Sequence, residues 1–115
     1  MSLLTIVIPC YNEEENIPRF FPELQKFVHK HGFQVIAVND GSRDKTAEKL
    51  AEFAEDPAFT IISHKCNKGY GGALKTGLKA VKSEFAITID SDGQHRLEDV
   101  LQLLEAVRSS TYRWL

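Results

Sequence analysis

Four short apolar runs alternate with longer stretches whose apolar residues recur at helical spacing. The runs are rich in Val, Ile and Phe, and they cover residues 3–8, 34–38, 59–63 and 85–89. Near-continuous apolar runs of this length are typical of parallel strands that are buried on both faces. Because strands alternate with helices through short loops, right-handed crossovers should join them. We therefore expect an α/β fold, with an open four-stranded parallel sheet, helices on both faces and four βα units.

The segments between these runs carry the helical patterns. One apolar face follows Asp44, a candidate N-cap, and two similar stripes lie within residues 73–81 and 100–107. The face after Asp44 consists of Ala47, Leu50, Ala51 and Ala54. In the first helix Asn16 is a candidate cap and Pro18 suits the first turn, but Pro22 predicts a kink or a later start.

Composition places the chain among ordinary globular proteins. Its 115 residues suit one domain spanning residues 1–115, and 43% hydrophobic with 26% charged residues is typical of such domains. The net charge of -2 and the lack of a basic block argue against nucleic acid as a partner. Cys10 and Cys66 both follow apolar runs, so we expect buried free thiols. Two thiols without a disulfide framework favour a cytoplasmic location.

The candidate chemistry lies in the loops that follow the four runs. These loops, residues 9–16, 39–44, 67–72 and 90–95, are rich in carboxylates, amides or glycine. In an open parallel sheet, ligands bind beyond the carboxyl ends of the strands, near the point where strand order reverses. The four loops are therefore expected to form one polar rim.

Asp90 and Asp92 give the sharpest signal on this rim. Two carboxylates spaced in this way at a strand end can both reach one hard cation if Gly93 turns the loop, and Gln94 offers a further carbonyl oxygen. Mg²⁺ or Mn²⁺ shared with a diphosphate would neutralise charge on a departing nucleoside diphosphate. The alternative is a solvated turn, because Asp-Gly and Ser-Asp are common turn pairs.

Asp40 and Lys68 follow the second and third runs. The Asp40 carboxylate can accept from nucleobase N–H groups; two oxygens would suit guanine, and one would suffice for uracil. The glycine-rich lead that contains Lys68 opens a helix, where backbone N–H groups and the lysine charge favour phosphate. The alternatives are a turn residue or helix cap for Asp40, and a merely permissive loop around Lys68.

Two side chains after the first run are less specific candidates. Tyr11 either lies against a base or ribose or fills space on the rim. Glu13 either accepts from a ribose hydroxyl or base edge, or suits the start of a helix electrostatically. Among the histidines, we interpret His64 as structural, and we leave His95 open between a role near the cation and none.

Four segments occur together in one order that is similar to a known family. They are residues 8–17, 38–46, 67–73 and 90–95, with the sequences IPCYNEEENI, VNDGSRDKT, NKGYGGA and DSDGQH. They resemble the opening of a GT-A-fold, family 2 glycosyltransferase of the dolichyl-phosphate-mannose-synthase-like, polyprenyl-phosphate branch. The resemblance covers nearly the whole chain. It implies an inverting transfer from a GDP- or UDP-sugar, usually onto a polyprenyl phosphate at a membrane surface.

The resemblance also assigns roles to individual residues. By resemblance, the nucleotide-sugar site is lined by Pro9, Tyr11, Glu13, Asp40, Lys68 and Asp90. The metal and diphosphate are held by Asp90, Asp92 and Gln94, with Asp92 as the catalytic residue. Arg96-Leu97 replaces prolines that the family usually has, which affects the loop shape, and the family's acceptor half lies beyond the last segment. We expect donor binding by this chain without turnover by it alone.

Two other interpretations share parts of these observations. Gly69 and Gly71 follow a strand with Asp90 about twenty residues on, as in a dinucleotide-binding oxidoreductase, but Leu74 occupies the third glycine position. Alternatively, the chain is a non-catalytic nucleotide-binding remnant or a partner-binding module. An exposed sheet edge would then allow it to form a homo-oligomer.

Overall fold

The computed structural model describes residues 3–92 and 97–109, and strands and helices alternate along it as expected. The strands are β1 (Leu4–Cys10), β2 (Gln34–Asn39), β3 (Phe59–Ser63) and β4 (Phe85–Thr88). The helices are α1 (Ile17–His31), α2 (Thr46–Ala51), α3 (Gly69–Lys79) and α4 (Leu97–Ser109). No helix in these two ranges is both long enough and apolar enough to span a bilayer.

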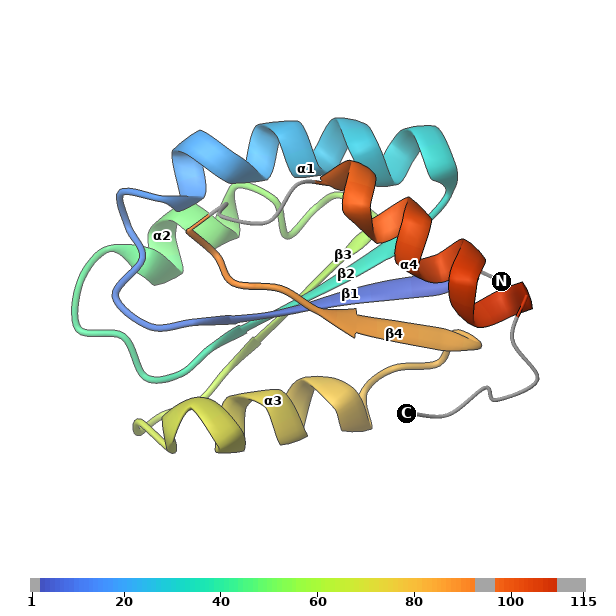
Figure 1. Ribbon diagram of the computed structural model, residues 1–115. Coiled ribbons are helices and arrows are strands. Elements are labelled where there is room, and N and C mark those ends of the chain that lie inside the picture. The colour runs from blue at the N-terminus through green and yellow to red at the C-terminus, as the bar shows by residue number, and fades with distance from the viewer. Residues whose placement is uncertain (1–2, 93–96, 110–115) are drawn as a thin grey trace.

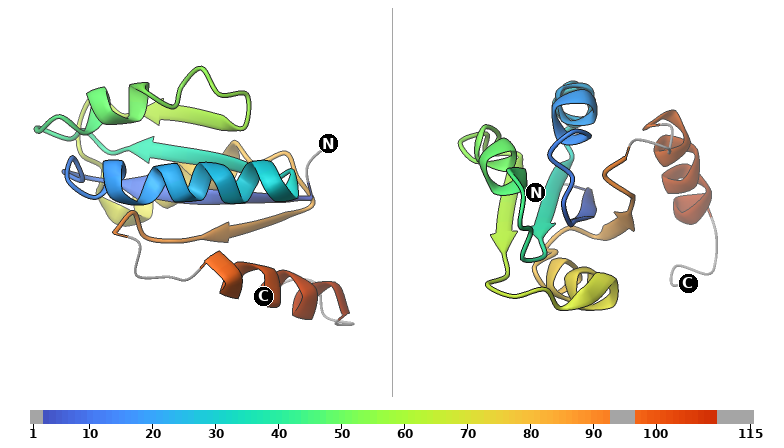
Figure 2. Two further views of the ribbon diagram at one scale, coloured as in Figure 1. Left: turned by 90° about the horizontal axis from the view of Figure 1, so that it is seen from above. Right: turned by 90° about the vertical axis from the view of Figure 1, so that its left-hand side faces the viewer.

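The four strands form one parallel sheet with the order β3-β2-β1-β4 (Figure 1). The chain adds β2 and β3 on one side of β1 and then crosses to add β4 on the other side. Consistent with this reversal, α1 and α2 cover one face of the sheet and α3 covers the other (Figures 1 and 2). Helix α4 lies beside β4, on the face that α1 covers. The predicted open α/β fold is confirmed, and strand order reverses between β1 and β4.

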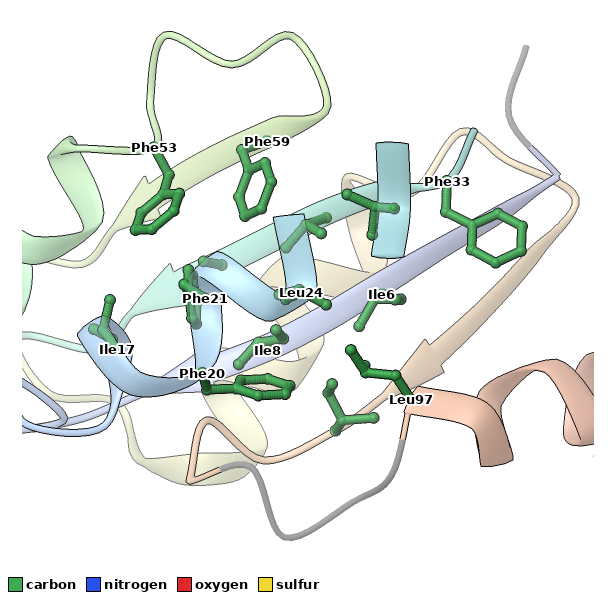
Figure 3. Close-up of a cluster of buried hydrophobic side chains, with 14 of the residues drawn as sticks. Ile6, Ile8, Ile17, Phe20, Phe21, Leu24, Phe33, Phe53, Phe59 and Leu97 are labelled. Atoms are coloured by element: carbon green, nitrogen blue, oxygen red, sulfur yellow. The ribbon is translucent and has the colours of Figure 1, made fainter. Parts of the chain in front are cut away.

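The larger hydrophobic core lies between the sheet and the helices α1, α2 and α4 (Figure 3). Phe21 of α1 is fully buried, and its ring centroid lies 5.4 Å from that of Phe53 and 6.1 Å from that of Phe59. Inward residues of β1, such as Ile6 and Ile8, complete the same cluster. Apolar burial of this kind supplies the main driving force that keeps the rim loops in place.

The opposite face of the sheet is covered by α3. A smaller cluster of Ile36, Val38 and Ala73 joins this helix to β2. Gly77 is buried at the centre of the contact, where an added Cβ would lie 2.5 Å from Cγ1 of Val7. The helix therefore rests directly on β1 and β2.

Strand β1 continues through Pro9 to Cys10, further than the apolar run predicts. The carbonyl of Val7 accepts a hydrogen bond from Ile89 on the β4 side, whereas the carbonyl of Cys10 accepts one from Asp40 on the β2 side. Pro9 therefore faces the β4 side, where a missing N–H interrupts no pairing with β2. The pairing of β1 with β4 ends at Val7 and Thr88, three residues before the pairing with β2 ends at Cys10.

The two edge strands are less buried than their sequences suggested. Thr60 of β3 and Ala86 and Thr88 of β4 are exposed, so the expectation of burial on both faces is wrong for these strands. Each pairs with a single neighbouring strand within the described ranges. Only β1 and β2 have the double-sided burial that near-continuous apolar runs predict.

Two helices also differ from expectation. Helix α1 begins at Ile17 and runs on through Pro22, which is exposed, so the late start is wrong. In α2 the expected alanine face is wrong, because Ala47 and Ala51 are exposed and Leu50 is buried together with other residues. The buried partners are Thr46 and Phe53, at i-4 and i+3 from Leu50. Phe53 buries far more apolar area than an alanine, so it determines which face turns inward.

Candidate functional site

A cavity of about 290 Å³ opens at the carboxyl ends of the strands, where strand order reverses. It is lined by Pro9, Cys10, Tyr11, Glu13, Asp40, Asn67, Gly69, Tyr70, Ala73, Asp90, Ser91 and Asp92. The loops after all four strands contribute to this lining. The prediction of one polar rim is therefore confirmed for the described residues.

The cavity lies where β1 and β4 separate. Their pairing stops at Val7 and Thr88. The opening beyond it is lined by Pro9 and Cys10 at the end of β1, by Tyr11 after it, and by Asp90, Ser91 and Asp92 after β4. Pro9 has no N–H to offer towards β4, so the ladder between the two strands lacks a donor here, which favours their separation. The backbone thus creates the opening that the side chains line.

The loops after β1 and β2 are joined by hydrogen bonds that involve both backbones. The N–H of Asn12 donates to Oγ of Ser42 (3.0 Å), and the N–H of Arg43 donates to Oδ1 of Asn12 (2.9 Å). Asn12 has a φ of 54°, the left-handed region that asparagine tolerates. These bonds fix the loop that carries Tyr11 and Glu13 beside the second strand.

A second connection between the same loops runs through Thr46. Its fully buried hydroxyl accepts from the N–H of Glu13 (2.8 Å) and donates to Oδ1 of Asp44. Oδ1 of Asp44 also accepts from the N–H of Thr46 (2.9 Å), so Asp44 caps α2 although Lys45 directly precedes the helix. Burial alone would raise the pKa of Asp44, but these bonds outweigh it and lower the pKa from its ordinary value.

Asp40 is buried at the back of the cavity and bonds to three neighbours. Its Oδ1 accepts from Nδ1 of His64 (2.7 Å) and from the N–H of Lys68 (2.8 Å), and its Oδ2 accepts from the N–H of Gly69 (2.9 Å). Burial acts to raise the pKa of Asp40, but these three donors outweigh it and lower the pKa. Asp40 is therefore ionised at neutral pH and holds the loop before α3 against β2.

The loop after β3 also packs tightly on the loop after β2. Gly41 has a φ of 67°, and an added Cβ would lie 2.6 Å from the N atom of Asn67. A side chain here would push the two loops apart. Because the amides of Lys68 and Gly69 are bonded to Asp40, they are not free to meet a phosphate, unlike our expectation for this glycine-rich lead.

The acidic side of the cavity carries Asp90 and Asp92. Asp90 is half-buried and Asp92 is exposed, and the hydroxyl of Tyr70 donates to Oδ1 of Asp90 (3.5 Å). Burial first, then the charge of Asp90 and this bond, raise the pKa of Tyr70. Within residues 3–92 and 97–109, no three His, Cys, Asp or Glu side chains cluster closely enough to hold a metal. Gln94 and His95 lie outside the described residues, so the role of Gln94 at the cation stays a prediction and the role of His95 stays open.

The other predicted site residues divide into two groups. Pro9, Tyr11 and Glu13 line the cavity, with Tyr11 42% exposed and Glu13 accepting from Nδ2 of Asn16 (2.6 Å). Asn16 therefore uses its side chain on Glu13 and does not cap α1 with it. Lys68 is exposed and lies beside the lining, where its backbone N–H, and not its side chain, makes the contact with Asp40.

The two cysteines behave differently. Cys10 is fully buried, and burial, followed by the nearby charge of Glu13, raises its pKa to about 12. Cys66 is exposed, so the prediction that it is buried is wrong. It lies in the loop after β3, beyond the strand end at Ser63, and the apolar run before it does not extend burial that far.

The structure brings in residues that the sequence did not single out. Tyr70 touches Asp90, Ser91 is buried in the lining, and His64 connects Asp40 to Thr76 through bonds at both ring nitrogens. The order of loops along the rim gives no direct signal for these contacts. We had interpreted His64 as structural, and its position directly after the end of β3 is the signal that could have placed it at the rim.

Comparison with known proteins gives a consistent result across the chain. The family model described as "Glycosyl transferase family 2" matches residues 5–112. A dolichyl-phosphate beta-glucosyltransferase from Trichomonas vaginalis is 29% identical over 92% of the chain and 35% of its own length. An undecaprenyl-phosphate 4-deoxy-4-formamido-L-arabinose transferase from Pectobacterium atrosepticum is 37% identical over 89% of the chain and 32% of its own length. The chain thus spans about a third of the length of these relatives.

Solved structures share the fold. TarS residues 1–349 from S. aureus in complex with UDP matches 94% of the chain and 33% of its own, with a TM-score of 0.75 and 25% identity. The mannosyltransferase PcManGT from Pyrobaculum calidifontis, solved with GDP-Man and Mn²⁺, matches 95% of the chain and 33% of its own, with a TM-score of 0.78 and 23% identity.

Proposed function

Because the chain belongs to glycosyl transferase family 2, whose model matches residues 5–112, we propose that its cavity is the donor site for a nucleotide sugar. One observation carries the proposal: loops from all four strands, including Tyr11, Asp40, Asp90 and Asp92, line a single cavity at the reversal of strand order. Membership of this family, with its GT-A fold, leaves the dinucleotide-binding interpretation without support.

Each part of the cavity suits one part of such a donor. The exposed ring of Tyr11 offers an apolar face for the base or ribose, and the buried carboxylate of Asp40 offers an acceptor for a base N–H. Glu13 also lines the cavity, and its carboxylate can accept from a ribose hydroxyl. Lys68, beside the lining, adds a positive charge for the diphosphate.

Asp90 and Asp92 fit a divalent cation. Both line the cavity and both carry the oxygen ligands that Mg²⁺ or Mn²⁺ prefers, with Gln94 proposed as a further ligand. The hydroxyl of Tyr70 donates to Asp90 and helps to orient it. When bound, such a cation neutralises charge on the departing nucleoside diphosphate. Asp92 is therefore the residue whose loss should affect donor binding most.

The reaction that we propose for this donor site is inverting transfer of the sugar to an acceptor such as a polyprenyl phosphate. Two relatives are named as dolichyl-phosphate and undecaprenyl-phosphate transferases, which supports a lipid-phosphate acceptor at a membrane surface. The chain spans about a third of those relatives, so we propose that it supplies the donor half of the reaction and does not turn over by itself.

Titration calorimetry with UDP and GDP, each with and without Mn²⁺, tests the donor site. We expect metal-dependent binding of at least one nucleotide, lost in Asp92→Ala. Glu23→Ala, an exposed carboxylate outside the lining, is the matched control and should bind as the unaltered chain does. Binding of neither nucleotide, with or without Mn²⁺, would contradict the donor-site proposal.

A second candidate function rests on the free edge of β4. Within the described ranges β4 pairs with β1 alone, and an apolar groove of about 340 Å³ lies between β4 and α4, with Leu103 55% exposed on it. A strand edge is self-complementary about a two-fold axis, so a second copy of the chain is the proposed partner of a non-catalytic module. Light scattering tests this: a dimer that Leu103→Glu converts to a monomer supports it, and a monomeric unaltered chain rejects it.

A further inference from the structure

The hydrogen bonds of Asp40 constrain which base this carboxylate can accept. Asp40 is only 3% exposed. Its Oδ1 accepts from Nδ1 of His64 at 2.7 Å and from the N–H of Lys68 at 2.8 Å, and its Oδ2 accepts from the N–H of Gly69 at 2.9 Å. A carboxylate offers about four acceptor positions, two on each oxygen. Donors from residues 3–92 therefore fill Oδ1 and, among the residues that the structure describes, leave a single position on Oδ2 for a ligand in the cavity, which Asp40 lines.

His64 fills its position on Oδ1 through a directed chain of hydrogen bonds. An ionised carboxylate only accepts, so Nδ1 of His64 must carry the proton that lies between it and Oδ1. Nε2 lies 2.8 Å from Oγ1 of Thr76, whose hydroxyl donates to it when the ring is neutral. Thr76 in α3 thus orients His64, and His64 holds Oδ1 of Asp40.

The bases differ in how many donors they present to a carboxylate. Guanine offers the ring N1–H and the exocyclic N2–H side by side, and full pairing with a carboxylate takes one position on each oxygen. Uracil offers one ring N–H, at N3, between two carbonyl groups. A carboxylate with a filled Oδ1 and one open position on Oδ2 therefore matches the single N–H of uracil. With guanine, the same carboxylate would leave one of the two donors unpaired, which is costly in a desolvated site.

We propose that the donor nucleotide carries uracil, and that His64 is the positioning residue that selects uracil over guanine by occupying Oδ1 of Asp40. The inference rests on the proposed donor site, since it assigns the base bound there. It makes His64 more than a structural residue: its ring determines how many acceptor positions Asp40 presents to the cavity.

The first test is calorimetry of the chain with Mn²⁺ and three ligands: UDP, GDP and UDP methylated at N3. We expect UDP to bind about tenfold or more tightly than GDP, and methylation to cost about tenfold or more, because a hydrogen bond to a charged group is lost. Equal binding of UDP and GDP, or of UDP and its N3-methyl form, overturns the base assignment while the donor site stands. Binding of none of the three overturns both.

The second test separates selection by His64 from simple support of the loop. In His64→Leu the position on Oδ1 is freed, so the ratio of UDP to GDP affinity should fall about tenfold. In His64→Asn the amide nitrogen takes the place of Nδ1, so the preference for UDP should be retained. A ratio that is unchanged in His64→Leu overturns the role of His64. If circular dichroism shows that His64→Leu is unfolded, His64→Asn provides the test instead. Loss of the preference for UDP over GDP in folded His64→Asn would then overturn the role of His64.

Discussion

Gly77 of α3 lies against Val7 of β1 so closely that a Cβ on the glycine would stand 2.5 Å from Cγ1 of the valine and 3.2 Å from Cγ2 of Val38. The contact sets the distance between α3 and the sheet. Since α3 begins at Gly69 and Tyr70, which line the cavity, this distance also places one wall of the proposed donor site.

Gly77→Ala should therefore destabilise the chain by about 1–3 kcal/mol, the usual cost of forcing an extra methyl group into a packed core. Gly71→Ala is the matched control in the same helix, because an added Cβ there meets nothing within 4 Å. It should leave stability unchanged or raise it by up to about 1 kcal/mol. Urea unfolding of both variants measures the difference; equal stability of the two would mean that the close approach of α3 is wrong.

The Thr46 hydroxyl links the loops after β1 and β2, so its removal should be costly. Thr46→Val preserves the shape of the buried side chain but leaves the N–H of Glu13 and the carboxylate of Asp44 without this partner. We expect a loss of about 1–3 kcal/mol in urea unfolding. Thr60→Val, on the exposed face of β3, is the control and should be near neutral. A neutral Thr46→Val would mean that the two loops are held together by other contacts.

The stability of the chain should depend on pH through Asp56, which connects α1 to the turn before β3. Burial acts to raise the pKa of Asp56, but donors from Gln25, Ala58 and His29 outweigh it and lower the pKa from its ordinary 3.8. A lowered folded pKa stabilises the fold above pH 3.8, and this contribution is lost as the pH falls through the folded pKa.

In Asp56→Ala we accordingly expect a loss of about 1–3 kcal/mol at neutral pH and a shallower fall in stability below about pH 4. Urea unfolding over this range checks both effects, with the exposed Glu55→Ala as the control. The acid dependence should be reduced and not abolished, because the pKa values of Asp40 and Asp44 are also lowered. An unchanged acid slope in Asp56→Ala would contradict this account.

The two thiols should react at very different rates. Cys66 is exposed, whereas Cys10 is buried with a pKa raised to about 12, and the thiolate is the reactive form. A thiol reagent at neutral pH should label Cys66 promptly and Cys10 only after unfolding in urea. Cys66→Ser should abolish the prompt reaction; rapid labelling that persists in this variant would show that Cys10 is accessible.

The sequence predicted the sheet and the polar rim for related physical reasons. Near-continuous apolar runs identify strands, and parallel strands bring their carboxyl ends to one edge, so Asp40 and Asp90 were expected at the same edge of the sheet. It could not give the depth of burial at the sheet edges, because Phe59 and Thr60 belong to one apolar run whether or not a layer covers both faces. The position of β4 at an edge is a property of strand order, which local pattern does not encode.

The spacing of residues along the sequence could not reveal which side chains would form hydrogen bonds with one another. From its position after a strand, Asp40 looked like a carboxylate free to bind a ligand. In the structure it is bonded to His64, which lies 24 positions further along the chain. Likewise, alanines at helical spacing after Asp44 looked like a buried face, although they contribute little apolar area. The larger Phe53, outside the counted stripe, settled the orientation of α2.

Pro9 makes the opening between β1 and β4 a feature of the backbone. Because the missing N–H of Pro9 weakens the ladder there, the opening does not depend on the exposed ring of Tyr11. Tyr11 can therefore be exchanged while the sheet persists, whereas Asp40, in the same lining, also holds a loop in place. Such a scaffold can acquire a new donor preference through substitutions at Tyr11 that leave its folding unchanged, and a library randomised at this position should consist mostly of folded proteins.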